Sequence, residues 1–401
     1  MGFTCALIGL PNVGKSTIFN ALTGANVEAT NYAFTSAQPN TGIVNVPDPR
    51  LDTISQLVEA KKTVYTSLEF VDLAGLAKGA SQGEGLGNQF LGRIREVDAI
   101  AHIVRCFEDA NIPHISEIIE PKSDIEAIDT ELIIADLETL EKRKTKLQKT
   151  AKSGDKDAKL QLDLIARITE TLDNNRPARA MKIHNDIEKK LIKEYNLLTS
   201  IPMLFVCNIQ DPSENSNNHV QTVKEYAAAE KIPVVILSGK LESEIMDIDD
   251  LEERKTFMKE MGLNEPGLNY MIQTGYDLLS LVTFFTVGGA ENRAWTIHQN
   301  SRAPQAAGTI HSDFERGFIR AVVYSFDDLV KYKNENAVKE AGKLRLEGKE
   351  YIVQDGDIIH FRFNVGINSF TLNVLFFGKL IKTNSIQSSC LKLQTYYLST
   401  E

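Results

Sequence analysis

Apolar positions along the chain fall into short continuous runs with helical stretches between most of them. The runs lie at residues 3–10, 41–46, 67–73, 99–107, 201–209 and 232–237. Runs of this length are typical of strands that are buried on both faces of a sheet. The pattern therefore predicts an α/β fold in which helices cover both faces of a parallel sheet.

The alternation is interrupted between residues 121 and 200, where Asp, Glu, Lys and Arg account for 31 of 80 residues. Apolar residues keep a spacing of three and four on both sides of a turn-like segment at 152–155: Ile125, Ile128, Leu132, Ala135, Leu140 and Leu147 before it, and Leu162, Ile165, Ile168 and Leu172 after it. This spacing predicts two antiparallel helices that share a narrow apolar seam and project from the sheet. The pattern is consistent with a docking element and equally with a solvated hairpin that has no partner.

Shorter strands punctuated by glycines mark a third region, from 281 to 364. The expected strands are 281–287, 294–298, 318–324 and 351–362, and one helical stretch is expected near 326–341. This mixture predicts a small α+β unit. The remaining residues, 365–401, have weak periodicity and predict no particular fold.

Composition narrows the class of protein. The chain has 401 residues and a net charge of −10, which argues against a general nucleic-acid coat or an anionic-membrane binder. No apolar run reaches the roughly 18 residues of a membrane span, and the first expected strand leaves no room for a signal peptide. The four cysteines show no metal spacing, so reduced thiols in the cytosol are expected.

Residues 9–16, GLPNVGKS, lie between the first expected strand and a helical stretch and fit the pattern GxxxxGK[ST]. In such a loop, backbone N–H groups point inward at phosphate oxygens, and the start of the helix adds positive potential. Lys15 can then neutralise the β- and γ-phosphates, and the Ser16 hydroxyl can bind Mg²⁺. We therefore expect a nucleoside triphosphate site.

A second motif, at residues 70–75, supports the first. It is an apolar strand that ends in Asp72 and is followed by Gly75. Such an aspartate can hold Mg²⁺ through water, and the glycine N–H can sense a γ-phosphate. A hydroxyl from the loop at 31–36 could complete the metal shell.

The group that would activate water is less obvious. Ras-type enzymes carry a glutamine after the glycine, but this chain has Leu76, which cannot orient water. His114 lies in an expected loop beyond a strand and could reach a γ-phosphate if that loop folds inward. An ordinary surface histidine is the alternative.

The base-reading segment is ambiguous. Guanine-specific enzymes of this class use Asn-Lys-x-Asp, in which the aspartate accepts the guanine protons. Here the strand at 201–207 is followed by Asn208, Ile209 and Asp211, so the lysine is missing. These residues alone leave adenine and guanine both open.

Many segments, in order along residues 1–364, resemble the Obg-like ATPases, the YchF-type branch of the translation-factor P-loop proteins. They include GLPNVGKST (9–17), QPNTG (38–42), FVDLAGLAKGAS (70–81), GEGLGNQFL (83–91), EPGLN (265–269), DFERGFIRA (313–321) and HFRFN (360–364). The resemblance implies a Ras-like P-loop NTPase domain at 1–120 and 201–280, a helical coiled-coil insertion at 121–200, and a C-terminal ubiquitin-like (β-grasp) TGS domain at 281–364. The tail at 365–401 has no counterpart in the family.

The resemblance also implies ATP hydrolysis with Mg²⁺, stimulation by K⁺, and association with the ribosome or a ribosomal subunit in the cytoplasm, without membrane or direct DNA contact. The family's nucleotide-contacting residues map onto Asn12, Val13, Gly14, Lys15, Ser16 and Thr17, and its metal hydroxyls onto Ser16 and Ser36. Its proposed catalytic histidine matches His114. Its P-loop asparagine, which is linked to K⁺ in related NTPases, matches Asn12.

One departure keeps alternatives open. The family usually has Glu where this chain has Asp211, and the shorter carboxylate resembles the guanine reader. The leading interpretation is an ATPase whose nucleotide state controls contact with the ribosome and which uses Asn208 and Ile209 near the adenine. One alternative is a GTPase with the same role. Another is a nucleotide-gated ribosome-binding protein with negligible turnover.

Overall fold

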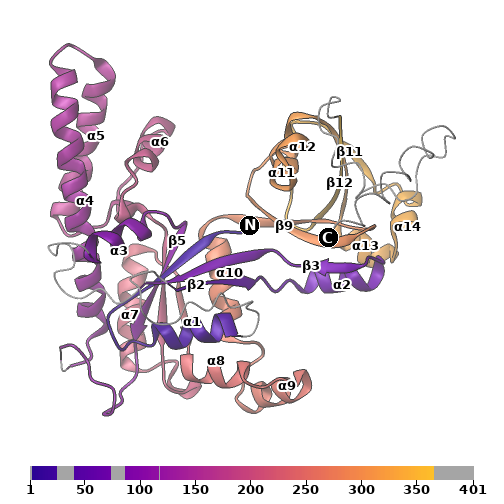
Figure 1. The fold of residues 1–401 in the computed structure, drawn as a ribbon, viewed down its shortest axis with the longest axis horizontal. Coiled ribbons are helices and arrows are strands. Elements are labelled where there is room, and N and C mark those ends of the chain that lie inside the picture. The colour runs from indigo at the N-terminus through magenta and orange to yellow at the C-terminus, as the bar shows by residue number, and fades with distance from the viewer. Residues whose placement is uncertain (1, 25–39, 74–85, 117, 365–401) are drawn as a thin grey trace, which may run out of the picture. The chain divides into compact units, whose positions relative to one another are not determined.

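The computed structural model describes residues 2–24, 40–73, 86–116 and 118–364. Within these residues, the predicted runs form a six-stranded sheet (Figure 1), with strands β1 (Thr4–Ile8), β2 (Asn40–Asn45), β4 (Ser67–Asp72), β5 (Ala99–Arg105), β6 (Met203–Asn208) and β7 (Val234–Leu237). Their order is β2-β4-β1-β5-β6-β7. The carboxyl ends of β1, β4, β5 and β6 share one edge, because these strands are parallel.

The prediction of an all-parallel sheet is wrong at one position, because β2 runs antiparallel to β4. Buried Val44 lies between exposed neighbours in β2, as is typical of an edge strand with one solvated face. An antiparallel edge strand needs no crossover helix, so the β-helix alternation did not report its direction.

Helices cover both faces of this sheet. The side chains of Ala6 and Ile8 enter the core beneath α3 (Leu86–Ile94), α4 (Pro121–Ala151) and α7 (Asn218–Glu230). Their neighbours Cys5 and Leu7 enter the core beneath α1 (Lys15–Gly24) and α10 (Gly267–Leu278). The predicted two-sided burial is therefore observed.

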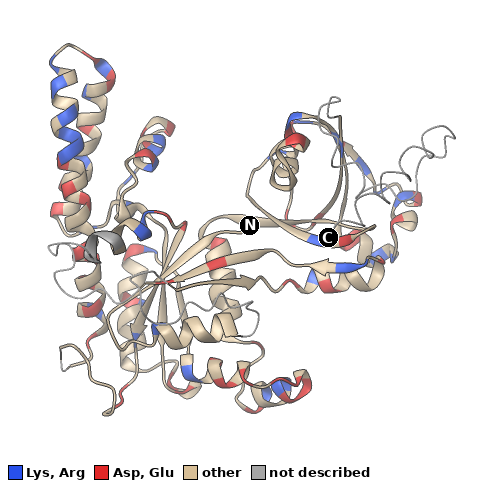
Figure 2. Cartoon of the chain, viewed as in Figure 1, with Lys and Arg blue, Asp and Glu red and all other residues tan. Residues whose placement is uncertain are grey.

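Helix α4 continues past the sheet and pairs with α5 (Lys156–Asp173). The turn lies where the sequence predicts it, and the carboxylate of Asp155 caps α5 by accepting from the Ala158 N–H at 2.9 Å. The first part of α4 packs on the sheet, because Ile125 and Ile128 belong to the sheet core. Farther along, Ile133 and Leu140 of α4 share a second core with α5, and the distal half of α4 lies beyond the sheet. Lys and Arg are concentrated on this distal half (Figure 2).

The other elements of this region include helices α6 (Asp186–Tyr195), α8 (Gly239–Met246) and α9 (Leu251–Glu260), and the 3-10 turns η1 (Ala178–Ala180), η2 (Leu198–Ser200) and η3 (Pro212–Glu214). Cys5, Cys106 and Cys207 are buried free thiols. Among the described residues, no helix has the length and apolar character needed to cross a membrane.

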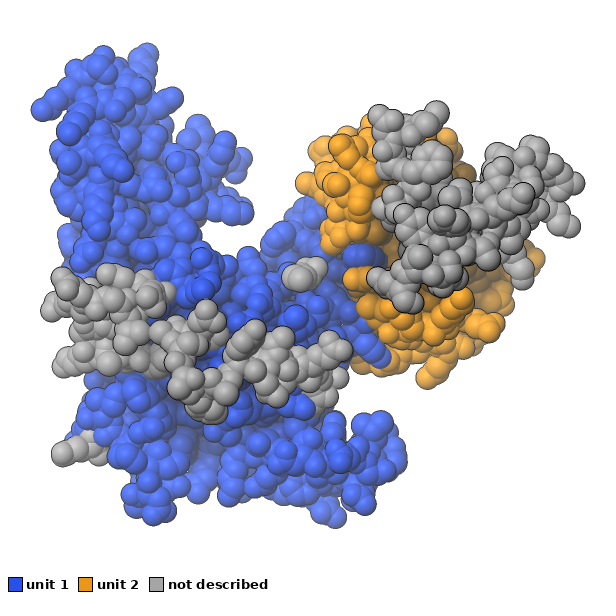
Figure 3. Space-filling model, viewed as in Figure 1, with its two compact units in different colours: residues 1–48, 65–283, 295–301 blue, residues 49–64, 284–294, 302–401 orange. Residues whose placement is uncertain are grey.

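The chain divides into two compact units (Figure 3), of which the second comprises residues 49–64, 284–294 and those from 302 onward. A second sheet has the order β11-β10-β12-β8-β9-β3 and consists of β3 (Lys62–Val64), β8 (Leu281–Thr286), β9 (Glu291–His298), β10 (Phe318–Ser325), β11 (Arg345–Glu347) and β12 (Asp357–Phe363). The second region also contains helices α2 (Pro49–Leu57), α11 (Ala303–Ile310), α12 (Ser312–Arg316), α13 (Phe326–Tyr332) and α14 (Glu335–Glu340).

Residues 49–64 lie in this second unit, whereas the sequence placed them in the nucleotide domain. Strand β3 extends the second sheet by pairing with β9 in parallel, and the Arg50 guanidinium lies 2.6 Å from the Asp355 carboxylate. The single helix predicted near 326–341 is two helices, because Lys333 has a φ of 71° and ends α13.

Candidate functional site

The loop at residues 9–16 joins β1 to α1 and has an unusual backbone path. Gly9, Asn12 and Gly14 all have positive φ angles, of 150°, 64° and 97°. A Cβ on Gly14 would collide with the side-chain amide of Asn208, and one on Gly9 with the carbonyl oxygen of Ile103. Glycine is therefore required at both positions for reasons of conformation and of space.

Lys15 is the first residue of α1 and is only 7% exposed. Its ammonium donates to the carbonyl oxygens of Gly9 (3.1 Å) and Leu10 (2.9 Å). Burial lowers the pKa of Lys15 to about 8, and the Asp72 carboxylate partly opposes this shift. A cation held by weak neutral acceptors is well placed to transfer to phosphate oxygens.

Ser16, in the first turn of α1, meets Asp72 at the end of β4. The Ser16 hydroxyl donates to Asp72 Oδ2 at 3.1 Å. Asp72 Oδ1 is buried and has no hydrogen-bond partner among the described residues. Burial raises the pKa of Asp72, and the Ser16 hydrogen bond and the Lys15 charge oppose the shift. An orphaned carboxylate oxygen beside a hydroxyl fits a hard cation such as Mg²⁺.

The remaining residues of the predicted loop are distributed around this pair. Val13 is buried, whereas Asn12, Ser16 and Thr17 are exposed. Ser36, Gly75 and Leu76 lie outside the described residues.

At the end of β6, Asn208 connects the phosphate loop to α8. Its amide donates to the Val13 carbonyl at 2.9 Å, and its side-chain oxygen accepts from the Gly239 N–H at 2.9 Å. Ile209 is 4% exposed and packs in the sheet core. Asn208 therefore supports the loop through its side chain, while Ile209 is an apolar core residue.

Asp211 is exposed and is used by its own turn. Its carboxylate accepts from the Ser213 N–H at 2.8 Å and the Ser213 hydroxyl at 2.6 Å, and so caps η3. These hydrogen bonds lower the pKa of Asp211. Both hydrogen bonds end on Oδ1, so a guanine base that needs both carboxylate oxygens would compete with Ser213 for that atom.

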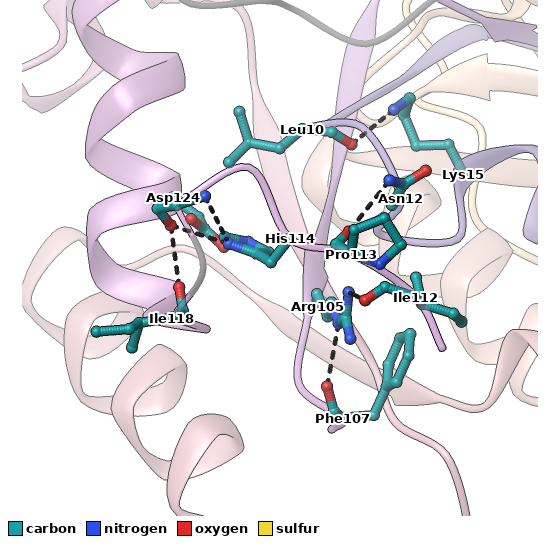
Figure 4. Close-up of polar contacts among 11 residues, drawn as sticks. Leu10, Asn12, Lys15, Arg105, Phe107, Ile112, Pro113, His114, Ile118 and Asp124 are labelled. Carbon is teal, nitrogen blue, oxygen red and sulfur yellow. Dashed lines mark hydrogen bonds and ion pairs between the residues drawn. The ribbon is translucent and has the colours of Figure 1, made fainter. Parts of the chain in front are cut away.

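His114 follows β5, but its ring is buried, with 3% of the side chain exposed, so it is not an ordinary surface histidine. Its Nε2 lies 3.0 Å from Asp124 Oδ2 of α4, and its Nδ1 accepts from the Ser116 N–H at 3.3 Å. The preceding residue, Pro113, accepts from the Asn12 side-chain amide at 3.1 Å (Figure 4). The loop that carries His114 is thus bonded directly to the phosphate loop.

Sequence reasoning missed two residues at this place, Arg105 and Asp124. Arg105 ends the buried strand β5, and its guanidinium donates to carbonyls of the loop that leads to His114. Asp124 lies in the first turn of α4. A charged residue that closes a buried strand was the one available signal for Arg105, but a spacing pattern could not indicate its partners.

Comparisons with known proteins agree with this geometry. A family model described as 50S ribosome-binding GTPase matches residues 4–143. A model for the YchF GTPase C-terminal region, described as a protein of unknown function, matches residues 281–364.

The ribosome-binding ATPase YchF of Escherichia coli O157:H7 is 52% identical over 365 residues, and that of Bacillus subtilis (strain 168) 51% over 370. Each match covers 91% of this chain and all of the relative. The structure of the Schizosaccharomyces pombe YchF GTPase aligns with a TM-score of 0.79 at 34% identity, over 90% of this chain and 98% of that one. The chain belongs to the YchF family.

Proposed function

We propose that this chain is a Mg²⁺-dependent ATPase whose nucleotide state regulates its association with the ribosome. The observation that carries the proposal is the buried Lys15 beside the Ser16–Asp72 pair, at the end of the strand that opens the phosphate loop. The curated relatives, which match over their whole length, are described as ribosome-binding ATPases.

Ser16 and Asp72 are the residues that would hold Mg²⁺, with Ser36 as a third donor. Held there, Mg²⁺ would supply positive charge that offsets the charge of the phosphates. Lys15 leaves the carbonyls of Gly9 and Leu10 for the phosphates, and the loop N–H groups donate to the remaining oxygens. K⁺ would lie beside Asn12, whose Oδ1 bonds to no described residue while its amide holds Pro113.

We assign the chemical step to His114. Nε2 donates to Asp124, because a carboxylate only accepts. Nδ1, which lies 3.3 Å from the Ser116 backbone nitrogen and 2.9 Å from the Ser116 hydroxyl, is then the side of the ring that can act as the base. Both nitrogens are engaged in this structure, so His114 must exchange these contacts for water and phosphate before hydrolysis. The Asn12–Pro113 hydrogen bond keeps its loop next to the nucleotide.

Adenine is the base that this site favours. A guanine base would compete with Ser213 for Oδ1 of Asp211, and no lysine is present at 209 to hold the base. We therefore expect ATP to bind at least as well as GTP, by less than about two orders of magnitude. A GTPase with the same role is the alternative that Asp211 supports.

The α4–α5 hairpin, which we interpret as the coiled-coil insertion, supplies a basic docking surface. Residues 142–159 hold eight Lys and Arg but only two Asp, in a chain of net charge −10. Five of these lysines pair with no described carboxylate: Lys146, Lys149, Lys152, Lys156 and Lys159. Ribosomal RNA presents the phosphates that such a surface binds. We interpret 281–364 as the TGS domain and as a second docking unit.

Parallel titration with ATP and GTP in Mg²⁺ and K⁺, followed by single-turnover hydrolysis with and without ribosomes, tests the proposal. An ATPase binds ATP at least as tightly as GTP and hydrolyses it within one turnover. Preference for GTP of more than about tenfold would make Asp211 the working base reader and the chain a GTPase. Tight ATP binding with no hydrolysis under either condition would leave only the nucleotide-gated binding protein.

A further inference from the structure

Arg105 is a buried arginine whose partners are all in one short loop. Its residue is 1% exposed. Nε donates to the Phe107 carbonyl at 3.1 Å, Nη1 to Ile112 at 3.0 Å, and Nη2 to Asp109 at 3.2 Å. The guanidinium carbon also lies 4.6 Å from the centroid of the Phe107 ring. The three guanidinium nitrogens therefore hold the loop at its start, its middle and its end.

The burial of this charge is not explained by an ion pair. No carboxylate among the described residues lies within salt-bridge distance of the guanidinium, although the charges of Asp109 and Asp124 favour it from farther away. Backbone carbonyls and one aromatic face therefore replace its hydration. Removing an arginine from water is costly, and an apolar side chain could fill the same space. An apolar side chain could not, however, donate hydrogen bonds to three carbonyls, as the planar guanidinium does.

The fixed loop ends next to the proposed chemistry. Ile112, which accepts from Nη1, is followed by Pro113, which accepts from Asn12 of the phosphate loop, and then by His114 (Figure 4). Arg105 is therefore connected to the phosphate loop by two hydrogen bonds, one to Ile112 and one between Pro113 and Asn12, through the peptide that joins Ile112 to Pro113.

We infer that Arg105 is a positioning residue for hydrolysis, which holds loop 106–114 so that Pro113 engages Asn12 and His114 stands at the nucleotide. The inference rests on the proposed role of His114. Arg105 acts through the loop that it holds, and the Lys variant used below keeps the positive charge that Asp124 also senses.

The test replaces Arg105 by Lys, which keeps the positive charge but cannot span three carbonyls with one nitrogen. Arg105→Lys should lower single-turnover hydrolysis about 10-fold to 100-fold, because small misplacements of reacting groups cost that much, and leave the ATP Kd within about threefold. Hydrogen exchange of amides 107–116 should become faster, while that of β1 and β6 stays unchanged. Phe107→Leu, which removes only the ring beneath the guanidinium, should act in the same direction with a smaller effect.

Arg179→Lys is the matched control. Arg179 also bonds a helix of the same unit, through Asp129 of α4, but among the described residues it makes no hydrogen bond or ion pair with loop 106–114. The Arg179→Lys variant should keep the wild-type rate of hydrolysis and the wild-type hydrogen exchange of the loop amides. If Arg179→Lys slowed hydrolysis as much as Arg105→Lys, the effect would be general loosening and the inference would fall.

A double-mutant cycle separates this inference from the proposed role of His114. In a His114→Ala background, Arg105→Lys should slow hydrolysis by less than about twofold, since the residue through which it acts is already gone. Equal losses in both backgrounds would overturn the inference while leaving the role of His114 intact. Full hydrolysis by His114→Ala alone would instead refute the proposed role, and wild-type loop exchange in Arg105→Lys would refute the positioning itself.

Discussion

Raising the pH from 7 to 9 should weaken nucleotide binding, because Lys15 begins to lose its proton in the free protein. Burial lowers the pKa of Lys15 to about 8 from the ordinary 10.5. Within the part of the chain that the structure describes, its ammonium donates to the carbonyls of Gly9 and Leu10, and Asp72 is the nearby carboxylate that supports its charge. A bound triphosphate places several negative oxygens at the same nitrogen, so the pKa of Lys15 must be higher in the complex than in the free protein.

The sign and size follow from this difference. Binding takes up a proton when the free pKa lies below the bound pKa, so affinity is constant below pH 8 and falls above it. About nine-tenths of Lys15 is protonated at pH 7 and about one-tenth at pH 9, so the Kd should rise about tenfold, or roughly 1.4 kcal/mol. The free energy of unfolding of the nucleotide-free protein should instead increase as the pH rises above 8. The lowered pKa of Lys15 opposes folding below pH 8, and this cost is relieved as the pH rises toward 10.5.

The assay is calorimetric titration with a non-hydrolysable ATP analogue, in buffers of different ionisation enthalpy, at several pH values between 7 and 9.5. Proton uptake should be about 0.5 per site at pH 8 and approach one at pH 9. Lys15→Ala provides the control, because the variant should show no proton uptake in this range. A wild-type Kd that is constant to pH 9.5, or proton uptake that persists in Lys15→Ala, would refute the reasoning.

The remaining predictions concern affinity, chemistry, docking and the base. Lys15→Ala should weaken ATP binding at least about tenfold at pH 7, since a charge-assisted contact is lost; unchanged affinity in calorimetry would reject the phosphate-loop assignment. His114→Ala should slow single-turnover hydrolysis by about 10²-fold or more with ATP affinity within a few-fold, and an unchanged rate would remove it from the mechanism. Replacing three lysines of the hairpin segment 142–159 (Lys146, Lys149 and Lys152) by Gln should weaken ribosome co-sedimentation and lower its salt slope by about two, with intrinsic hydrolysis intact. The same change at Lys224, Lys255 and Lys259 on α7 and α9 serves as the control and should leave both unchanged. Ile209→Lys should shift the ratio of ATP and GTP dissociation constants toward GTP, measured after a thermal melt has shown that the buried position tolerates the lysine; an unshifted ratio in the folded variant would contradict the account of base reading.

Much of this protein is determined by local sequence. The apolar runs predict the strands of the first sheet, and the GxxxxGK[ST] pattern predicts the loop whose glycines the structure needs at positions 9 and 14. The turn at 152–155 was also predictable, because Asp155 caps the next helix from within its own segment. In each case the pattern and the structure depend on residues that are close in the chain.

The tertiary structure alone decided the features that depend on distant partners. Strand β3 extends the second sheet because β9, more than two hundred residues away, offers it an edge. Asp124 reaches His114 because α4 packs on the sheet, and Asn12 reaches Pro113 because β1 and β5 are neighbours. The sequence shows Arg105 only as an arginine at the end of a strand, and its three carbonyl partners are brought to it by the fold of the following loop. Periodicity indicates which face of an element is buried, but not which residues that face contacts. The proposed chemistry of this site depends on those tertiary contacts.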